Sequence, residues 1–263
     1  MILTGRSVLV TGATGGIGPA IADRLHGAGA RLTLTGRRTD VLEPLAARTA
    51  ARSLAADLAL AADVERLAAE CADVDVLVAN AALPASGPLL SFSAEEIDRA
   101  LAVNLRAPMI LARLLGEQMA ARGSGHIVFV SSLAGKAGTP GSSVYSATKF
   151  ALRGFGQGLR ADLRDAGVGV SVIFPGFIRD AGMFADSGAK LPRYVGTSTP
   201  DEVAEAVVRA IERNRGEIDV APVGVRLSAT VAGVAPGVMA AASRRLGAGR
   251  IAQRLAAGQA DKR

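Results

Sequence analysis

The stretch Val8-Leu-Val-Thr-Gly-Ala-Thr-Gly-Gly-Ile-Gly18 decides the fold of this chain. An apolar run ends at Thr11, glycines follow, and a helical pattern of apolar residues starts at Ile21. This order predicts a strand, a tight turn and a helix whose free N–H groups face the strand end. Glycines in such a turn let the backbone approach a pyrophosphate. A glycine-rich turn without a ligand is the less favoured alternative, given its place after the first strand.

Further strands alternate with helical patterns along the chain. Such alternation predicts a parallel sheet covered by helices on both faces, which is a doubly wound α/β/α sandwich in three layers. Two capping boxes mark helix starts, Ser93 with Glu96 and Thr199 with Glu202. The seven expected strands are 7–11, 31–35, 52–56, 74–79, 126–131, 168–174 and 217–221.

Size and composition fit one α/β domain. The chain has 263 residues, of which 49% are hydrophobic, and this is enough for a large core. Cys71 is the sole cysteine, so no intrachain disulfide can form, which fits a reducing compartment. No signal peptide precedes the first strand and no apolar run reaches the length of a membrane span. We therefore expect a cytoplasmic protein.

The formal net charge of +6 raises the question of a nucleic-acid partner. The chain has no Trp, two Tyr and no long basic run before its C-terminal part, so we expect no nucleic-acid binding. A basic surface also suits an anionic small molecule. We expect no metal site, because His26 and His126 have no partners at ligand spacing.

A candidate acid–base pair lies in Tyr145-Ser-Ala-Thr-Lys149. Residues four positions apart share one face of a helix, so the ammonium of Lys149 should lower the pKa of the Tyr145 phenol. A phenol with a lowered pKa can donate and accept protons near neutral pH. Ser132, at the end of the fifth expected strand, could donate a hydrogen bond to the same oxygen. Ser131 should point to the other side of the strand.

Together these motifs resemble the classical short-chain dehydrogenase/reductase family. Its cofactor motif is similar to Thr11-Gly-x-x-x-Gly16-x-Gly18, and its catalytic trio to Ser132, Tyr145 and Lys149. Asn80-Ala-Ala82, Asn104 and Pro175-Gly176 also match family segments, in order, between about residues 6 and 220. The resemblance implies a Rossmann-like fold and a nicotinamide cofactor, with a homodimer or homotetramer as the assembly.

By this resemblance, Tyr145 exchanges a proton with the substrate oxygen and Ser132 polarises that oxygen. Lys149 also binds the nicotinamide ribose, and Asn104 holds a water that links Lys149 to solvent. Asp57 would accept from the adenine amino group, although it could instead cap the next turn. The resemblance places further cofactor contacts at Gly12, Thr14, Gly16, Ile17, Gly18, Leu58, Asn80, Ala81, Pro175, Gly176 and Ile178.

The end of the second strand indicates which dinucleotide is preferred. It carries Arg37 and Arg38 and no acidic residue that could grip the ribose hydroxyls. Arginine attracts a 2′-phosphate that a carboxylate would repel, so the sequence favours NADP(H) over NAD(H), with Arg37 as the better candidate. The alternative is that the arginines are only solvated.

Three places depart from the family pattern. Ala79 and Ala82 replace an Asn and a Gly, and Ala82 then needs an ordinary backbone conformation. Asp180 stands where Thr is frequent, and its carboxylate would repel phosphate unless it paired, for example with Arg179.

Residues 181–199 are expected to form the substrate lid of a single catalytic domain over 1–225. Met183 and Phe184 would give substrate an apolar wall, or else pack on a neighbouring helix. Residues 226–263 form a basic, apolar helical extension. It could cover the substrate mouth, contact another subunit or lie on anionic lipid; its Pro and Gly residues favour packing or a subunit contact.

The sequence thus predicts an NADP-dependent oxidoreductase that interconverts a carbonyl and a secondary alcohol on a partly apolar small molecule. An NAD-dependent dehydrogenase of the same family is the runner-up. A non-catalytic nucleotide-binding sensor or scaffold is the alternative from another class, since fold alone does not fix function.

Overall fold

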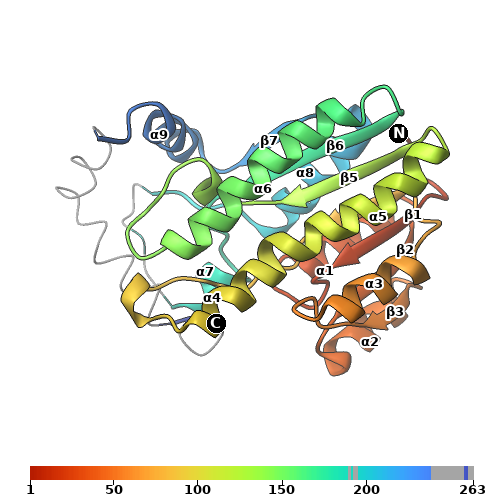
Figure 1. Ribbon diagram of the computed structural model, residues 1–263, viewed down its shortest axis with the longest axis horizontal. Coiled ribbons are helices and arrows are strands. Elements are labelled where there is room, and N and C mark those ends of the chain that lie inside the picture. The colour runs from red at the N-terminus through yellow and green to blue at the C-terminus, as the bar shows by residue number, and fades with distance from the viewer. Residues whose placement is uncertain (189–190, 192–194, 238–257, 260–263) are drawn as a thin grey trace.

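The computed structural model describes residues 1–188, 191, 195–237 and 258–259. In this part of the chain, seven strands form one parallel sheet with the order β3-β2-β1-β4-β5-β6-β7 (Figure 1). The order reverses beside β1, which is the usual place for a ligand crevice in a doubly wound sheet. The strands are β1 Ser7–Thr11, β2 Arg31–Gly36, β3 Arg52–Ala55, β4 Val76–Ala79, β5 Gly125–Val130, β6 Val168–Pro175 and β7 Glu217–Val220.

Helices cover both faces of the sheet, so the three-layer Rossmann-like sandwich is confirmed (Figure 1). One face carries α1 (Gly18–Gly27), α2 (Thr39–Arg48) and α8 (Pro200–Arg213). The other carries α3 (Ala61–Glu70), α5 (Ala107–Ala121) and α6 (Ser143–Asp162). The remaining elements are η1 Leu89–Ser91, α4 Ala94–Leu101, η2 Ala102–Arg106, η3 Leu133–Gly135, α7 Met183–Asp186 and α9 Val223–Val234.

The core has two parts, one on each face of the sheet, because successive side chains of a strand point to opposite faces. Val8 and Val10 pack with α1 and α8, whereas Leu9 between them packs with α3 and α5. Cys71 is 1% exposed and lies with Leu9 in the core on the side of α3 and α5, so it is a packing residue. Burial raises the pKa of the Cys71 thiol to about 11.

The strand predictions are confirmed, with shifted ends. The largest shift is at β4, which begins at Val76 instead of position 74. Asp75, just before β4, bonds to both neighbouring strands through its backbone, donating to the Ser7 carbonyl oxygen at 2.8 Å and accepting from the His126 N–H at 3.0 Å. Its carboxylate also accepts from the Ser7 N–H at 2.8 Å and pairs with Arg6 at 3.0 Å. Both capping boxes are present, at Ser93 with Glu96 and at Thr199 with Glu202.

A π-helical segment, η2, joins α4 to α5. Pro108 follows it and has no N–H for the carbonyl four residues earlier, which belongs to Asn104. One-turn π segments inside helices frequently mark functional sites. Here the segment carries a residue that the sequence singled out, Asn104.

The predicted boundary between the catalytic domain and the C-terminal extension, after residue 225, falls inside the helix α9. It lies at the end of the molecule toward which the β5 arrow points (Figure 1). Within the described residues, no helix combines the length and the apolar character that crossing a membrane requires. The parts of the predicted lid and extension at 189–190, 192–194, 238–257 and 260–263 lie outside the described residues.

Candidate active site

A large cavity opens at the carboxyl ends of the strands. Its volume is about 1310 Å³, which exceeds the size of most small-ligand pockets. Segments after β1, β2, β4, β5 and β6 line it, together with α6, α7 and α9. Of the predicted site residues, all but Gly18 and Asn104 line this one cavity.

The glycine loop after β1 lines one end of the cavity. Gly12 has φ +65°, and a Cβ there would lie 2.6 Å from the Ala81 Cα, so only glycine fits. The side-chain amide of Asn80 donates to the carbonyl oxygens of Thr11 at 3.2 Å and Gly12 at 3.0 Å. Asn80 therefore holds the loop in shape from the neighbouring strand.

The glycine loop leads into α1, which begins at Gly18. Ile17 is the N-cap of this helix and has no side-chain cap, and no acidic residue occupies the first turn. The free N–H groups and the positive end of the helix dipole therefore face an end of the cavity without a competing carboxylate. This arrangement can bind an anion such as a phosphate.

Arg37 and Arg38 border the same end of the cavity but make different contacts. Arg38 donates to the carbonyl oxygen of Thr14 and so braces the glycine loop. The Arg37 guanidinium lies 4.0 Å from Asp57 and its side chain is 53% exposed. Arg37 is therefore the freer of the two to meet an anionic ligand.

Asp57 has a contact that the sequence did not predict. Its Oδ1 accepts from the Ala59 N–H at 3.0 Å, which is the turn-capping alternative. Its Oδ2 accepts from the Arg99 guanidinium of α4 at 3.3 Å. Arg99 lies 42 residues further along the chain, and nothing in the local sequence of either residue signals the pair.

Thr35, which no sequence motif singles out, borders the cavity. Its hydroxyl oxygen is buried and has no hydrogen-bond partner among the described residues. A Cβ on the next residue, Gly36, would lie 2.8 Å from the Thr14 hydroxyl, so glycine is needed there for close packing.

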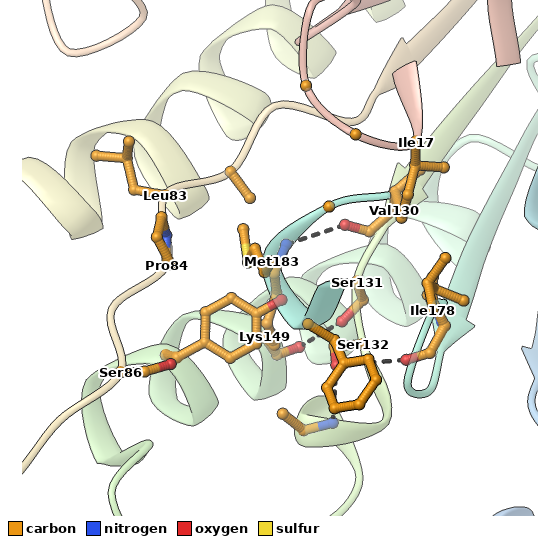
Figure 2. Close-up of a pocket in the computed structure, with 18 of the residues that line it drawn as sticks. Ile17, Leu83, Pro84, Ser86, Val130, Ser131, Ser132, Lys149, Ile178 and Met183 are labelled. Carbon is orange, nitrogen blue, oxygen red and sulfur yellow. Dashed lines mark hydrogen bonds between the residues drawn. The ribbon is translucent and has the colours of Figure 1, made fainter. Parts of the chain in front are cut away.

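The two serines after β5 point in different directions, as expected. Ser131 donates to the carbonyl oxygen of Lys149 at 3.0 Å and is buried. Ser132 accepts from the Ala134 N–H at 3.1 Å and donates to the Pro175 carbonyl oxygen at 3.4 Å. Figure 2 shows both serines on the wall opposite Leu83 and Pro84.

Tyr145 and Lys149 lie one helical turn apart on α6, and the ammonium is 5.5 Å from the centre of the phenol ring. Lys149 is 1% exposed and donates to the Val130 carbonyl oxygen at 3.0 Å (Figure 2). Burial lowers the pKa of Lys149 to about 8. Burial raises the pKa of Tyr145 to about 12, and its interaction with the Ser132 hydroxyl acts in the opposite direction.

The expectation of a lowered Tyr145 pKa is therefore wrong for this structure. Spacing on a helix brings the two groups together, but it says nothing of the solvent that both lose. Removing the phenol from water disfavours its anion, and this effect is the largest one acting on Tyr145. The phenol is consequently held in its protonated form at neutral pH.

Asn104 holds the loop that faces these groups. Its Oδ1 accepts from the Leu83 N–H at 2.6 Å and its Nδ2 donates to the Leu83 carbonyl oxygen at 3.0 Å. Asn104 is 1% exposed and does not line the cavity. The structure thus gives it a positioning contact, and its link to Lys149 through a water stays a prediction.

The segment after β6 closes the other side of the cavity. A short parallel bridge with Ser198 uses the N–H of Arg179 and the carbonyl oxygen of Phe177, and leaves the peptide groups of Ile178 out of these bonds. Asp180 has φ +72° and pairs with Arg179 at 3.5 Å, as expected if its charge is to be neutralised. Ala82 is not among the residues with positive φ, as its side chain requires.

Met183 and Phe184 line the cavity, and their role in a substrate lid stays a prediction. The Phe184 ring lies 5.3 Å from that of Phe177. Other parts of the cavity wall have no signal in the local sequence, because only the fold brings their segments together; they include Leu83, Pro84, Val225, Ala229 and Ala232.

The described residues contain no group of three or more His, Cys, Asp or Glu side chains that could hold a metal ion. His126 is buried and its Nε2 lies 2.8 Å from the Ser171 hydroxyl. Burial, with a smaller contribution from Arg160, lowers the pKa of His126 to about 3, so it is a neutral structural residue.

Comparisons with known proteins show which proteins the chain is similar to. Ketoacyl reductase HetN of Nostoc sp. (strain PCC 7120) is 37% identical over 225 residues, which is 82% of this chain and 78% of that protein. The solved short-chain dehydrogenase of Sphingobium yanoikuyae, in complex with NADPH, is 28% identical, with a TM-score of 0.77 and coverage of 89% of this chain and 95% of that one.

A further solved structure is the bulky-bulky ketone specific alcohol dehydrogenase of Comamonas testosteroni. It is 25% identical, with a TM-score of 0.76, and the alignment covers 89% of this chain and 94% of that one. The family model described as short chain dehydrogenase matches residues 6–192. With more than half of its length matched by that model, this chain belongs to the short-chain dehydrogenase family.

Proposed function

We propose that this protein is an NADP(H)-dependent oxidoreductase that interconverts a ketone and a secondary alcohol on a partly apolar small molecule. The observation that carries the proposal is the arrangement of Ser132, Tyr145 and Lys149 in one wall of a cavity whose far end holds Arg37. Relatives named as a ketoacyl reductase and a bulky-ketone alcohol dehydrogenase support the reaction class.

The residues present fit a nicotinamide dinucleotide. Gly12 and the N-terminus of α1 provide close backbone approach and free N–H groups for a diphosphate. The exposed guanidinium of Arg37 can form a bidentate contact with a 2′-phosphate. The NADPH- and NADP-bound structures of relatives support this fit.

When bound, the cofactor supplies or accepts the hydride at the substrate carbon. In ketone reduction, the Tyr145 hydroxyl transfers its proton to the carbonyl oxygen, which gains negative charge. The Ser132 hydroxyl donates a hydrogen bond to the same oxygen and so stabilises that charge. The charge of Lys149 favours the phenolate that remains, which is then reprotonated from solvent. In alcohol oxidation, the Tyr145 phenolate accepts the proton.

The substrate is proposed to lie against Met183 and Phe184 and against the inner face of α9. This wall is apolar and excludes water, which strengthens the contact between the Ser132 hydroxyl and the developing charge. A ketone with a substantial apolar part fits such a wall. The homodimer or homotetramer, the single catalytic domain over 1–225 and the cytoplasmic location remain proposals.

The first test is a titration of the purified protein with NADPH and NADH, followed by a panel of apolar ketones and aldehydes at the absorbance of the reduced nicotinamide. We expect tighter binding of NADPH and ketone-dependent oxidation of it. Binding without turnover in either direction would favour the sensor or scaffold class. Failure to bind either dinucleotide would overturn the proposal.

The Tyr145→Phe variant tests the mechanism directly. We expect turnover to fall by about 10²–10⁴-fold with nearly unchanged NADPH binding, because only the proton donor is removed. Ser143→Ala removes an exposed hydroxyl from the same helix and serves as the control. Full activity in the Tyr145→Phe variant would remove this residue from the mechanism.

A further inference from the structure

The outer face of α9 is unusual, because its apolar residues face away from the protein. Val223, Leu227, Val231 and Val234 are 75%, 62%, 38% and 84% exposed. Their spacing of four, four and three residues places them on one side of the helix. A stripe of four exposed apolar side chains is typical of a surface that contacts a partner.

The opposite side of the same helix lines the cavity. Val225, Ala229 and Ala232 face the cavity, again at spacings of three and four residues. The helix therefore separates the cavity from whatever covers its outer stripe. In Figure 1 it stands at the edge of the molecule, at the end toward which the β5 arrow points.

The distribution of charge shows what kind of partner fits. Residues 1–222 contain 23 basic and 23 acidic residues, so this part has no net charge. Residues 223–263 contain seven basic residues and one acidic residue. The whole net charge of +6 therefore lies in the segment that begins with α9. Exposed apolar side chains combined with an excess of Arg are typical of a segment that binds an anionic lipid surface.

We propose that α9 docks on an anionic lipid surface through the stripe formed by Val223, Leu227, Val231 and Val234. The apolar side chains enter the boundary between headgroups and acyl chains, and the positive charge that the sequence carries from residue 223 onward attracts the anionic headgroups. A second copy of the chain is a weaker fit, because a helix of 12 residues is about 18 Å long and offers less than the roughly 800 Å² per partner of a stable interface.

Docking in this way would leave α9 between the lipid and the cavity. The inner face of α9 would then contact substrate while its outer face contacts the membrane. This consequence rests on the proposed function, whereas the docking itself does not.

The test is cosedimentation of the full chain with sucrose-loaded vesicles of phosphatidylcholine, with and without phosphatidylglycerol. We expect at least about tenfold stronger binding to the anionic vesicles at low salt, and loss of most of this difference in high salt. Equal or absent binding to both vesicle types would overturn the proposal.

The double variant Leu227→Gln/Val231→Gln tests the stripe. We expect it to weaken vesicle binding by about tenfold or more, since both side chains lose their apolar contact with lipid. Leu60→Gln, which changes an exposed leucine before α3, is the matched control and should bind as the parent does. Equal binding of the double variant would also overturn the proposal.

Two further measurements separate this proposal from its alternatives. Light scattering without vesicles reports the molar mass of the protein in solution. If the double variant has a lower molar mass than the parent, and the parent does not bind vesicles, the stripe contacts a second copy of the chain instead of lipid. The activity of the double variant on a water-soluble ketone is expected to match that of the parent, because neither residue lines the cavity. An inactive protein that still binds anionic vesicles would contradict the proposed function alone.

Discussion

Gly16 and Gly182 lie against each other across one side of the cavity: a Cβ atom on Gly16 would come within 2.1 Å of the Gly182 amide nitrogen. One belongs to the glycine loop after β1 and the other to the segment after β6. Gly182 has φ +87°, which other residues rarely adopt. Two backbones without side chains therefore meet where the segment after β6 approaches the glycine loop.

The first prediction follows from this contact. Gly16→Ala should displace the segment around Gly182 and weaken NADPH binding by about tenfold or more, because backbone atoms cannot yield as a flexible side chain does. Fluorescence titration of NADPH measures the effect. Gly27→Ala, at the end of the helix that follows the glycine loop and with open space around it, is the control. Unchanged binding in Gly16→Ala would show that the segment around Gly182 moves freely.

The second prediction concerns cofactor choice. Arg37→Asp should lower the ratio of kcat/KM with NADPH to that with NADH by about 10²-fold, because a carboxylate repels the 2′-phosphate. Arg164→Asp makes the same charge change in the loop between α6 and β6, away from the cavity, and should leave the ratio unchanged. Were both variants to keep the parental ratio, Arg37 would not select the cofactor.

The third prediction is a pH dependence that differs between the two directions. Burial raises the pKa of Tyr145 to about 12, so ketone reduction has its proton donor in place at neutral pH. Alcohol oxidation needs the phenolate, so its rate should rise steadily with pH over the neutral and alkaline range. Reduction should decline above about pH 8, where Lys149 loses its charge. Parallel pH profiles for the two directions would contradict this assignment.

The fourth prediction uses His126, whose pKa burial lowers from 6.5 to about 3. Below pH 6.5 the unfolded chain binds a proton that the folded one does not, so stability falls as pH drops toward 3. The slope is about 1.4 kcal/mol per pH unit in that window. His126→Gln should remove this part of the slope in urea unfolding between pH 4 and about 6. The exposed His26→Gln is the control and should keep it.

The fifth prediction concerns Asn104. Asn104→Ala leaves both peptide groups of Leu83 without a partner in a buried place, so the free energy of unfolding should fall by about 1–3 kcal/mol. Asn104→Asp keeps the acceptor for the Leu83 N–H and should lose less at pH 7. Urea denaturation compares the variants. Equal losses would indicate that the contact with the Leu83 N–H contributes little.

Local patterns predicted the parts of the fold that depend on neighbours in sequence. The apolar run ending at Thr11 predicted β1 with its bounds, and Thr199 with Glu202 predicted the start of α8, because a period and a cap are local features. The strand ends that differ are set by tertiary contacts. At β4, the carboxylate of Asp75 bonds to Ser7 of the neighbouring strand.

For the site, too, local motifs were predictive and tertiary contacts were not. The family motifs predicted side chains that line one cavity, such as Tyr145 and Ser132. Pairs of residues that only the fold brings together could not be predicted, for example Arg99 with Asp57. The pKa of Tyr145 was also predicted in the wrong direction, because burial is a property of the packed structure and not of the spacing to Lys149.

Cys71 gives the protein a practical property. The thiolate is the reactive form of cysteine, and burial both shields this thiol and raises its pKa to about 11. No other cysteine exists in the sequence. The native chain is therefore expected to react only slowly with maleimides near neutral pH. A single cysteine placed at an exposed position such as Ser143 would take a fluorophore selectively, without first removing a native thiol.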